Sequence, residues 1–226
     1  YKRQHYEYSV LMEDIVSVQA LNSLRKFYTD DAGYALAKQV DTDLIALGEG
    51  FNGGTTVDRS YDTAFIGTGA TAFSGTNEAA IDDAGIRAFI LKLDNADVPM
   101  DNRVLIIPPV AANTLLGIQR FTEQSFIGNG DAIKNGQIGQ IYGIDVLVST
   151  NCATVKGSGG TGNSAAGTER VGIMMHKDAL ILAEQVGVRT QTQYKQEYLG
   201  DLLTADTLYG VKELRNDAGI AFVVPA

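Results

Sequence analysis

The stretch NSLRKFYTDDAGYALAKQVDTDLIAL, residues 22–47, decides the fold. It holds no proline and one glycine, Gly33, and its apolar side chains recur every three or four residues. That spacing places them on one face of an α-helix, which at about 26 residues would be roughly 40 Å long. Gly48 and Gly50 are expected to end it. We predict a helix over about 22–48, and its packing face is expected to consist of Tyr28, Ala32, Leu36, Val40, Leu44 and Leu47.

The segment before this helix, YKRQHYEYSV (1–10), has the alternation of a β-strand. No complementary strand lies nearby in the sequence. We therefore expect it to pair with a segment upstream of Tyr1, as the returning arm of a hairpin in a longer, trimmed or processed protein. Such a strand would expose its edge and the aromatic faces of Tyr6 and Tyr8, which we predict as subunit contacts. The alternative is a frayed chain end.

A second helix is expected after a glycine- and threonine-rich loop at 51–75. Thr76 would cap this helix, which would end before Pro99. Its packing face is expected to contain Ile81, Ala84, Ala88 and Leu91, widened by Ile86, Phe89, Ile90 and Leu93.

The rest of the chain mixes strands with short helices. The sequence predicts strands at 103–108, 138–141, 144–149, 171–176, 188–194, 202–214 and 220–224, helices at 109–119 and 177–185, and an exposed glycine-rich loop at 152–169. Residues 103–186 look self-contained. This order of elements predicts an α+β fold.

Composition excludes several classes of protein. The 226 residues are 45% hydrophobic, which is typical of a globular chain of one or two domains. A net charge of −9 disfavours a dedicated nucleic-acid binder. The single cysteine, Cys152, rules out an intrachain disulfide, and the two histidines weaken any catalytic triad. The longest apolar run, VLIIPPVAA (104–112), is far shorter than the roughly 18 residues of a membrane span.

The residues that carry chemistry form no recognisable site. The glycine-rich stretches 157–163 and 67–75 lack the full phosphate-binding patterns, so we interpret them as flexible loops. Paired acidic residues on helices diverge and do not converge on one cation. His176 is expected to be a structural cap, and nothing indicates an activated thiol at Cys152. We predict no catalytic residues, no metal and no cofactor.

Several blocks of the chain together resemble tailed-bacteriophage major capsid proteins, a coat-protein fold shared with herpesviruses and encapsulins. These blocks are LMEDIVSVQA (11–20) with YALAKQVDTDLIAL (34–47), NRVLIIPPVAANTLL (102–116), GQIYGIDVLVSTN (139–151), HKDALILAEQ (176–185) and DTLYGVKELRNDAGIAFVV (206–224). They follow the order of the family and cover most of the chain.

The resemblance implies a fold with a long spine helix and mixed sheets. Residues 1–10 would be the returning strand of an extended loop. Residues 11–102 and 188–226 would form a peripheral domain, and residues 103–187 an axial domain. Further subunit contacts are expected in the glycine-rich loop at Gly157, Gly159 and Gly160.

The function implied is structural and not enzymatic. Copies of the chain would form pentamers and hexamers that build an icosahedral shell, holding double-stranded DNA without specific binding. Scaffold and portal proteins would be partners, no membrane would be involved, and the protein would enter the virion after assembly in the host cytoplasm. The alternatives are an encapsulin-like nanocompartment shell, a tail or decoration protein, and a nucleotide-binding enzyme that uses the glycine-rich loops.

Overall fold

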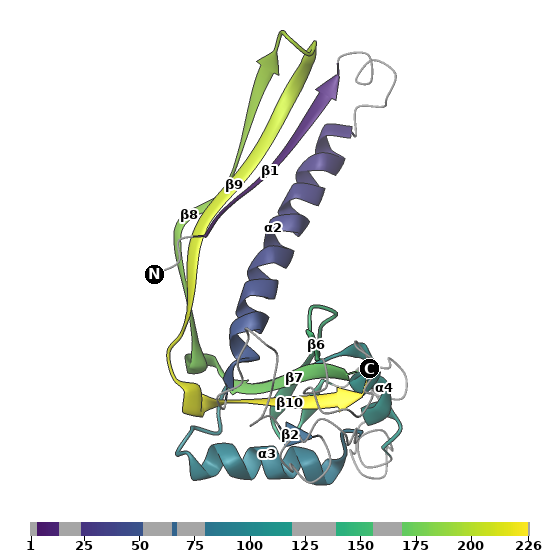
Figure 1. Cartoon of the computed structure of the whole chain (residues 1–226), viewed down its shortest axis with the longest axis vertical. Helices are drawn as coiled ribbons and strands as arrows, with labels where there is room; N and C mark the ends of the chain where they lie inside the picture. Colours follow the sequence, from purple (N-terminus) through teal and green to yellow (C-terminus); the bar gives the residue numbers. More distant parts are fainter. Residues whose placement is uncertain are drawn as a thin grey trace, which may run out of the picture. The chain divides into compact units, whose positions relative to one another are not determined.

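The computed structural model describes residues 4–13, 24–51, 65–66, 80–118, 139–155 and 169–225. The chain divides into two compact units, each assembled from two stretches of sequence. Unit 1 contains Tyr1–Asp43 and Ile181–Lys212, and unit 2 contains Leu44–Leu180 and Glu213–Ala226. Both units combine helix and sheet, which confirms the α+β fold (Figure 1).

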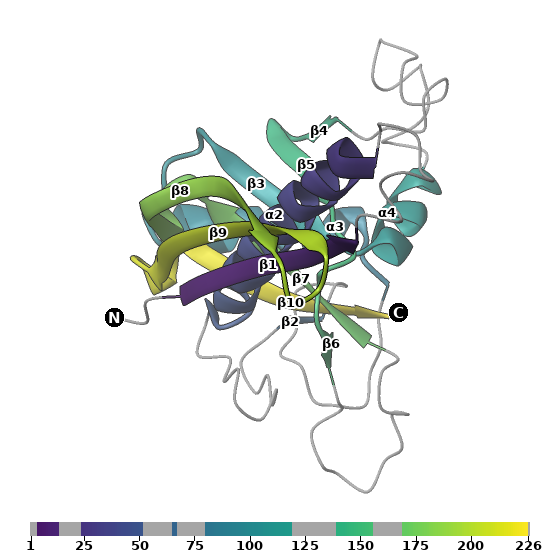
Figure 2. The same cartoon turned by 90° about the horizontal axis from the view of Figure 1, so that it is seen from above.

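Unit 1 is a three-stranded sheet with one long helix on one face. The strands are β1 (Gln4–Glu13), β9 (Gly200–Glu213) and β8 (Leu180–Lys195), in the order β1-β9-β8. β1 runs antiparallel to β9, with a register from Gln4 opposite Tyr209 to Glu13 opposite Gly200. The helix α2 spans Leu24–Gly48 and contributes its residues up to Asp43 to this unit. Figure 2 shows this helix beside the strands β1, β9 and β8.

The predicted long helix is confirmed, and its last residue is a closely packed glycine. α2 stops at Gly48, where a Cβ atom would lie 2.9 Å from the side chain of Ile173 in unit 2. Only glycine fits at that distance without a shift of Ile173. Ile45, near the same end, is buried in the core of unit 2.

The predicted strand at 1–10 is present, and it has a partner that the sequence did not indicate and a later end than expected; its pairing with a segment upstream of Tyr1 stays a prediction. β1 pairs with β9, about two hundred residues further along the chain, and it continues to Glu13. Sequence proximity could not indicate such a partner. In the described part of the chain, β1 keeps its other edge unpaired.

Unit 2 is built on a mixed sheet. The strands are β2 (Phe65–Ile66), β10 (Gly219–Pro225), β7 (Glu169–His176), β3 (Arg103–Ile107), β5 (Ile144–Val148) and β4 (Gln140–Ile141), in that spatial order, with β6 (Thr154–Val155) beside β7. β2–β10 and β3–β5 pair in parallel and the other pairs are antiparallel. The helices α3 (Asp83–Asn95) and α4 (Pro109–Leu116) complete the unit.

The core of unit 2 lies around stacked aromatic rings. Phe89 of α3 and Phe222 of β10 have ring centroids 4.8 Å apart, and both are fully buried. The apolar strand β3 is buried along most of its length, as the run RVLII predicts. α4 starts at Pro109, also as predicted. None of the described helices has the length and apolarity that a membrane crossing requires.

Two helix predictions need correction. α3 is capped by Asp82, whose Oδ1 accepts from the backbone N–H of Gly85 at 2.7 Å, so the helix does not start at Thr76. Its buried face contains Ile86, Phe89 and Leu93, whereas the expected face residues Ala84 and Leu91 are exposed.

The short helix expected at 177–185 is wrong as well. A single 3-10 turn, η2 (Lys177–Ala179), leads directly into the long strand β8. Pairing with β9 decides this segment, and it overrides the local apolar pattern.

The two compact units do not follow the expected division at residues 102 and 187. α3 and β10 belong to unit 2 together with residues 103–180. Because peripheral and axial are positions within an assembled ring, the assignment of those two domains stays a prediction.

Candidate functional site

The helix face predicted from the sequence lies against the sheet of unit 1 as far as Val40, and its last two members, Leu44 and Leu47, belong to unit 2. Ala32 and Leu36 are buried, and they form a small apolar cluster with Ala205 of β9. The other members of the predicted face are half-buried: Tyr28, Val40, Leu44 and Leu47. The cluster is small because two of its three buried members are alanines.

Tyr6 and Tyr8 belong to this interface inside the chain. Both pack against the cluster of Ala32, Leu36 and Ala205. The Tyr8 hydroxyl donates to Asp31 of α2 at 2.7 Å, and the Tyr6 ring stacks on Tyr209 at 5.6 Å. α2 thus covers part of each ring, and both tyrosines are half-buried. A subunit contact at these two residues stays a prediction.

The opposite face of the same sheet holds a polar group that joins its three strands. Arg189 of β8 donates from Nε and Nη2 to the two carboxylate oxygens of Asp206, both at 2.8 Å, and His5 Nε2 lies 3.3 Å from Asp206 Oδ2. The hydrogen bonds from Arg189 are the main cause that lowers the pKa of Asp206. These residues are far apart in the sequence, so no local sequence motif predicts that they interact.

Exposed apolar side chains gather on β8 and at the hairpin tip after it. Leu182, Val188 and Tyr194 are about half exposed, and Tyr198 and Leu199 at the tip are 63% and 66% exposed. Leu199 also adopts a positive φ of 45°, which is rare for leucine.

Strand alternation fixes the face on which the exposed residues of β8 lie. Ala205 faces α2, so its neighbour Asp206 and the bound Arg189 face away. Leu182, Val188 and Tyr194 are an odd number of residues from Arg189, which puts them on the α2 side of the sheet. Exposed apolar residues on an edge strand are typical of contacts with another chain. Sequence reasoning missed this surface because it predicted a helix at 177–185, where Leu182 lies, and named no contact residues on the strand that it predicted at 188–194.

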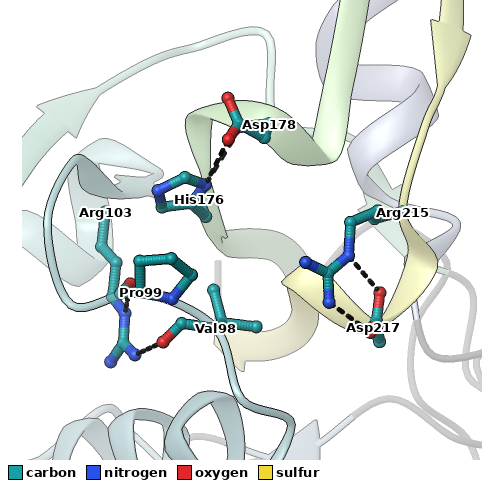
Figure 3. Close-up of polar contacts among 7 residues, drawn as sticks. All are labelled: Val98, Pro99, Arg103, His176, Asp178, Arg215 and Asp217. Atoms are coloured by element: carbon teal, nitrogen blue, oxygen red, sulfur yellow. Dashed lines mark hydrogen bonds and ion pairs between the residues drawn. The ribbon is translucent and has the colours of Figure 1, made fainter.

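In unit 2, a buried arginine fixes the turn between α3 and β3. The Arg103 side chain is 2% exposed and donates to the Val98 and Pro99 carbonyls at 2.6 and 2.8 Å (Figure 3). It also binds Asp94 Oδ1 at 2.6 Å. The guanidinium group thus satisfies carbonyls of a turn in which Asp97 has a φ of 54°.

The remaining polar groups of this corner have structural partners too. The Nδ1 atom of the buried His176 accepts from the Asp178 backbone N–H at 3.2 Å, which confirms the predicted cap. The same Nδ1 atom lies 3.6 Å from Asp178 Oδ2 (Figure 3). Arg215 pairs with Asp217 through two hydrogen bonds of 3.1 and 2.7 Å.

Cys152 lies in an environment that suppresses its chemistry. The residue is buried, and this burial together with the nearby Glu49 carboxylate raises the pKa of the thiol to about 11. Glu49 is itself buried and accepts from the Ala153 backbone N–H at 2.8 Å. In the described ranges, no cluster of three or more histidine, cysteine, aspartate or glutamate side chains could hold a metal ion.

The predicted glycine contacts lie outside the described residues. Gly157, Gly159 and Gly160 fall in the gap between 155 and 169, and the stretch 67–75 falls in another gap. The prediction of subunit contacts in the glycine-rich loop therefore stays open.

Comparison with solved structures shows where this fold occurs. The structure titled "Mycobacterium phage Che8" is 22% identical with a TM-score of 0.70, over 97% of this chain and 70% of that one. The capsid of Cyanophage P-SCSP1u gives 19% identity and a TM-score of 0.71, over 97% and 72% of the two chains. The capsid of Ralstonia phage GP4 gives 13% and 0.69, over 99% and 73%. These likenesses establish the fold.

Comparison at the level of sequence families identifies the chain. The search of curated proteins found no match. A family model described as "Phage capsid protein" matches residues 14–221, which is most of the sequence. This match and the fold point to the same conclusion, which the residue blocks had indicated. The chain belongs to the phage capsid protein family.

Proposed function

We propose that copies of this capsid protein assemble into pentamers and hexamers, which build a closed icosahedral shell around packaged double-stranded DNA. The observation that carries the proposal is the family match over residues 14–221. A chain of this family has a structural role, and its partners in a shell are other copies of itself.

The exposed apolar surface of unit 1 supports contacts between copies. β8 offers Leu182, Val188 and Tyr194 on one face, and the hairpin tip offers Tyr198 and Leu199. In a ring, each copy presents one surface to the next copy and receives a different one, which is a head-to-tail contact. Each contact can be weak, because a shell multiplies the number of contacts per copy.

The domain assignment is part of the same proposal. Residues 11–102 and 188–226 would form the peripheral domain with α2 as its spine, and residues 103–187 would lie toward the symmetry axis of each ring. Tyr6, Tyr8 and the loop glycines Gly157, Gly159 and Gly160 are the contact residues proposed from the sequence.

Net charge supports the proposed relation to DNA. The chain carries 18 basic and 27 acidic residues, a balance that repels phosphate at long range. A shell with such walls confines DNA without binding it tightly. We propose that assembly occurs in the host cytoplasm, with scaffold and portal proteins as partners, and that the protein ends in the virion.

Electron microscopy of the purified product, with a nuclease-protection assay on its contents, tests the proposal. We expect closed shells of uniform diameter with five- and six-fold rings, and protected DNA in shells from infected cells. Tubes, isolated trimers or monomers would contradict it, and shells filled with a protein cargo would favour a nanocompartment.

Two variants of one strand test the contact surface. Val188→Asp places a charge on the exposed apolar face, and we expect it to reduce shell yield while circular dichroism stays unchanged. Gln191→Asp places the same charge on the opposite face and should assemble normally. Equal yields from both variants would argue against this surface.

A further inference from the structure

The contact between α2 and its sheet has a small buried apolar cluster. Among the described residues its buried members are Ala32, Leu36 and Ala205, and the half-buried rings of Tyr6 and Tyr8 pack against them. The helix face repeats an apolar residue every four positions from Tyr28 to Leu44. A shift of the helix by four residues, about 6 Å along its axis, would therefore bring another apolar side chain to each place.

A cluster of polar side chains lies at one end of this contact. The Tyr209 hydroxyl of β9 donates to Asp43 Oδ2 at 2.5 Å, and Gln39 Nε2 donates to Asp43 Oδ1 at 3.1 Å. Gln39 Nε2 also approaches the Tyr6 hydroxyl of β1 at 3.4 Å. Tyr6, Gln39, Asp43 and Tyr209 thus join the helix to two strands, and we call them the Asp43 cluster.

Because Tyr209 is buried, the hydrogen bonds of the Asp43 cluster depend on where α2 lies along the sheet. Tyr209 is only 3% exposed, and its ring stacks on Tyr6. A buried hydroxyl without a partner is costly, so Tyr209 needs an acceptor at one place on the helix. Asp43 supplies it in the observed arrangement.

Contacts at the other end of the helix agree with the same alignment. Arg25 of α2 lies 3.5 Å from Asp201 of β9. From residue 25 to 43 the helix advances 18 residues, about 27 Å, and from 201 to 209 the strand advances 8 residues, also about 27 Å. The helix and β9 therefore run in the same direction, with polar contacts at matching ends.

We propose that the Asp43 cluster is a conformational device that selects one register of α2 on its sheet, which the apolar face alone leaves ambiguous. Buried polar groups that specify register at little gain in stability are known from helical assemblies. Gln39 is four residues from Asp43 on the same helix face, so it is the group that a one-turn shift would bring to Tyr209. Loss of Asp43 then permits a second register and does not merely weaken the first.

Hydrogen-exchange mass spectrometry of the full chain tests the proposal under native conditions. Peptides from α2 and β1 should each give one isotopic envelope in the unmodified protein. Asp43→Ala and Tyr209→Phe should give two envelopes in these peptides, because two registers coexist. Asp43→Asn keeps an oxygen acceptor and should restore one envelope.

Tyr8→Phe is the matched control. It removes a hydroxyl from the same sheet face, but its partner Asp31 is exposed, and the control should keep one envelope. A uniform acceleration of exchange in Tyr209→Phe, with one envelope throughout, would overturn the proposal. Tyr209→Phe alone decides the outcome if Asp43→Ala does not fold, since it removes only one oxygen atom.

Discussion

Replacing Leu36 by aspartate should undock α2 from the sheet of unit 1. Leu36 is 4% exposed, and the other buried members of its cluster are alanines, so it is the largest buried side chain of that cluster. Truncation of a buried leucine to alanine lowers the free energy of unfolding by about 2–5 kcal/mol. Because a small cluster can relax around the missing atoms, we expect a loss of about 3 kcal/mol at Leu36. A buried carboxylate without a partner adds about 1–3 kcal/mol. The sum, about 5 kcal/mol, equals the whole stability of many domains.

Urea unfolding followed by far-ultraviolet circular dichroism measures this effect, since the chain has no tryptophan to report by fluorescence. Leu36→Ala should lose about 3 kcal/mol. Tyr34→Asp changes a residue of the same helix that is 68% exposed, and it should stay within about 0.5 kcal/mol of the unmodified protein. Electron microscopy should find no shells for Leu36→Asp. A Leu36→Asp protein of ordinary stability that still assembles would refute the packing assigned to this face.

Three further changes test other parts of the structure by the same unfolding assay. Gly172→Ala would place a Cβ atom 2.4 Å from the ring of Phe222, so it should lower the free energy of unfolding by about 1–3 kcal/mol. Phe222→Leu in the same chain should recover part of this loss, and simple additivity of the two changes would contradict the contact. Asp82→Ala removes the acceptor of the Gly85 N–H and should cost about 1 kcal/mol, whereas Asp82→Asn should cost less. Burial and the neighbouring Asp43 raise the pKa of Tyr209 above its ordinary value of 10.0. The stability that the neutral hydroxyl provides is therefore present below pH 10.0, and it is lost at higher pH, where the tyrosine of the unfolded chain ionises. Tyr209→Phe should lose less stability per pH unit in this range, and equal slopes for the two proteins would count against the assigned burial.

The elements that sequence reasoning placed well are those governed by a long, regular pattern. The four-residue spacing from Tyr28 to Leu47 predicts α2 nearly to its ends, because a helix repeats over many turns. The continuous run RVLII predicts β3, and Pro109 predicts the start of α4.

The errors concern elements that distant partners decide. β8 begins with apolar residues that fit a short helix equally well, and its pairing with β9 selects the strand. β1 finds its partner near residue 205, beyond any local signal. At α3, Thr76 and Asp82 both have side chains suited to a cap, and residues 80–82 are not helical in the structure, so Asp82 holds this role.

The candidate surfaces were predictable only in part. Tyr6 and Tyr8 were noticed because they alternate on a strand, but alternation does not tell whether the covered side faces a helix of the same chain or another copy. The Asp43 cluster joins β1, α2 and β9, three segments that meet only in the folded unit. Tyr198 and Leu199 lie in the turn between the long strands β8 and β9. The sequence predicted a shorter strand at 188–194 in place of β8, so it did not indicate a long hairpin with these residues at its tip.

The burial of Cys152 makes this protein convenient for chemical labelling. Its thiol is the only one in the chain, it is closed off from solvent, and its pKa of about 11 keeps it protonated near neutral pH. A cysteine introduced at an open position such as Met100, which is 72% exposed, would then react alone with a maleimide dye or spin label. Probes could thus be attached one site at a time in the natural sequence background, without first deleting the native thiol.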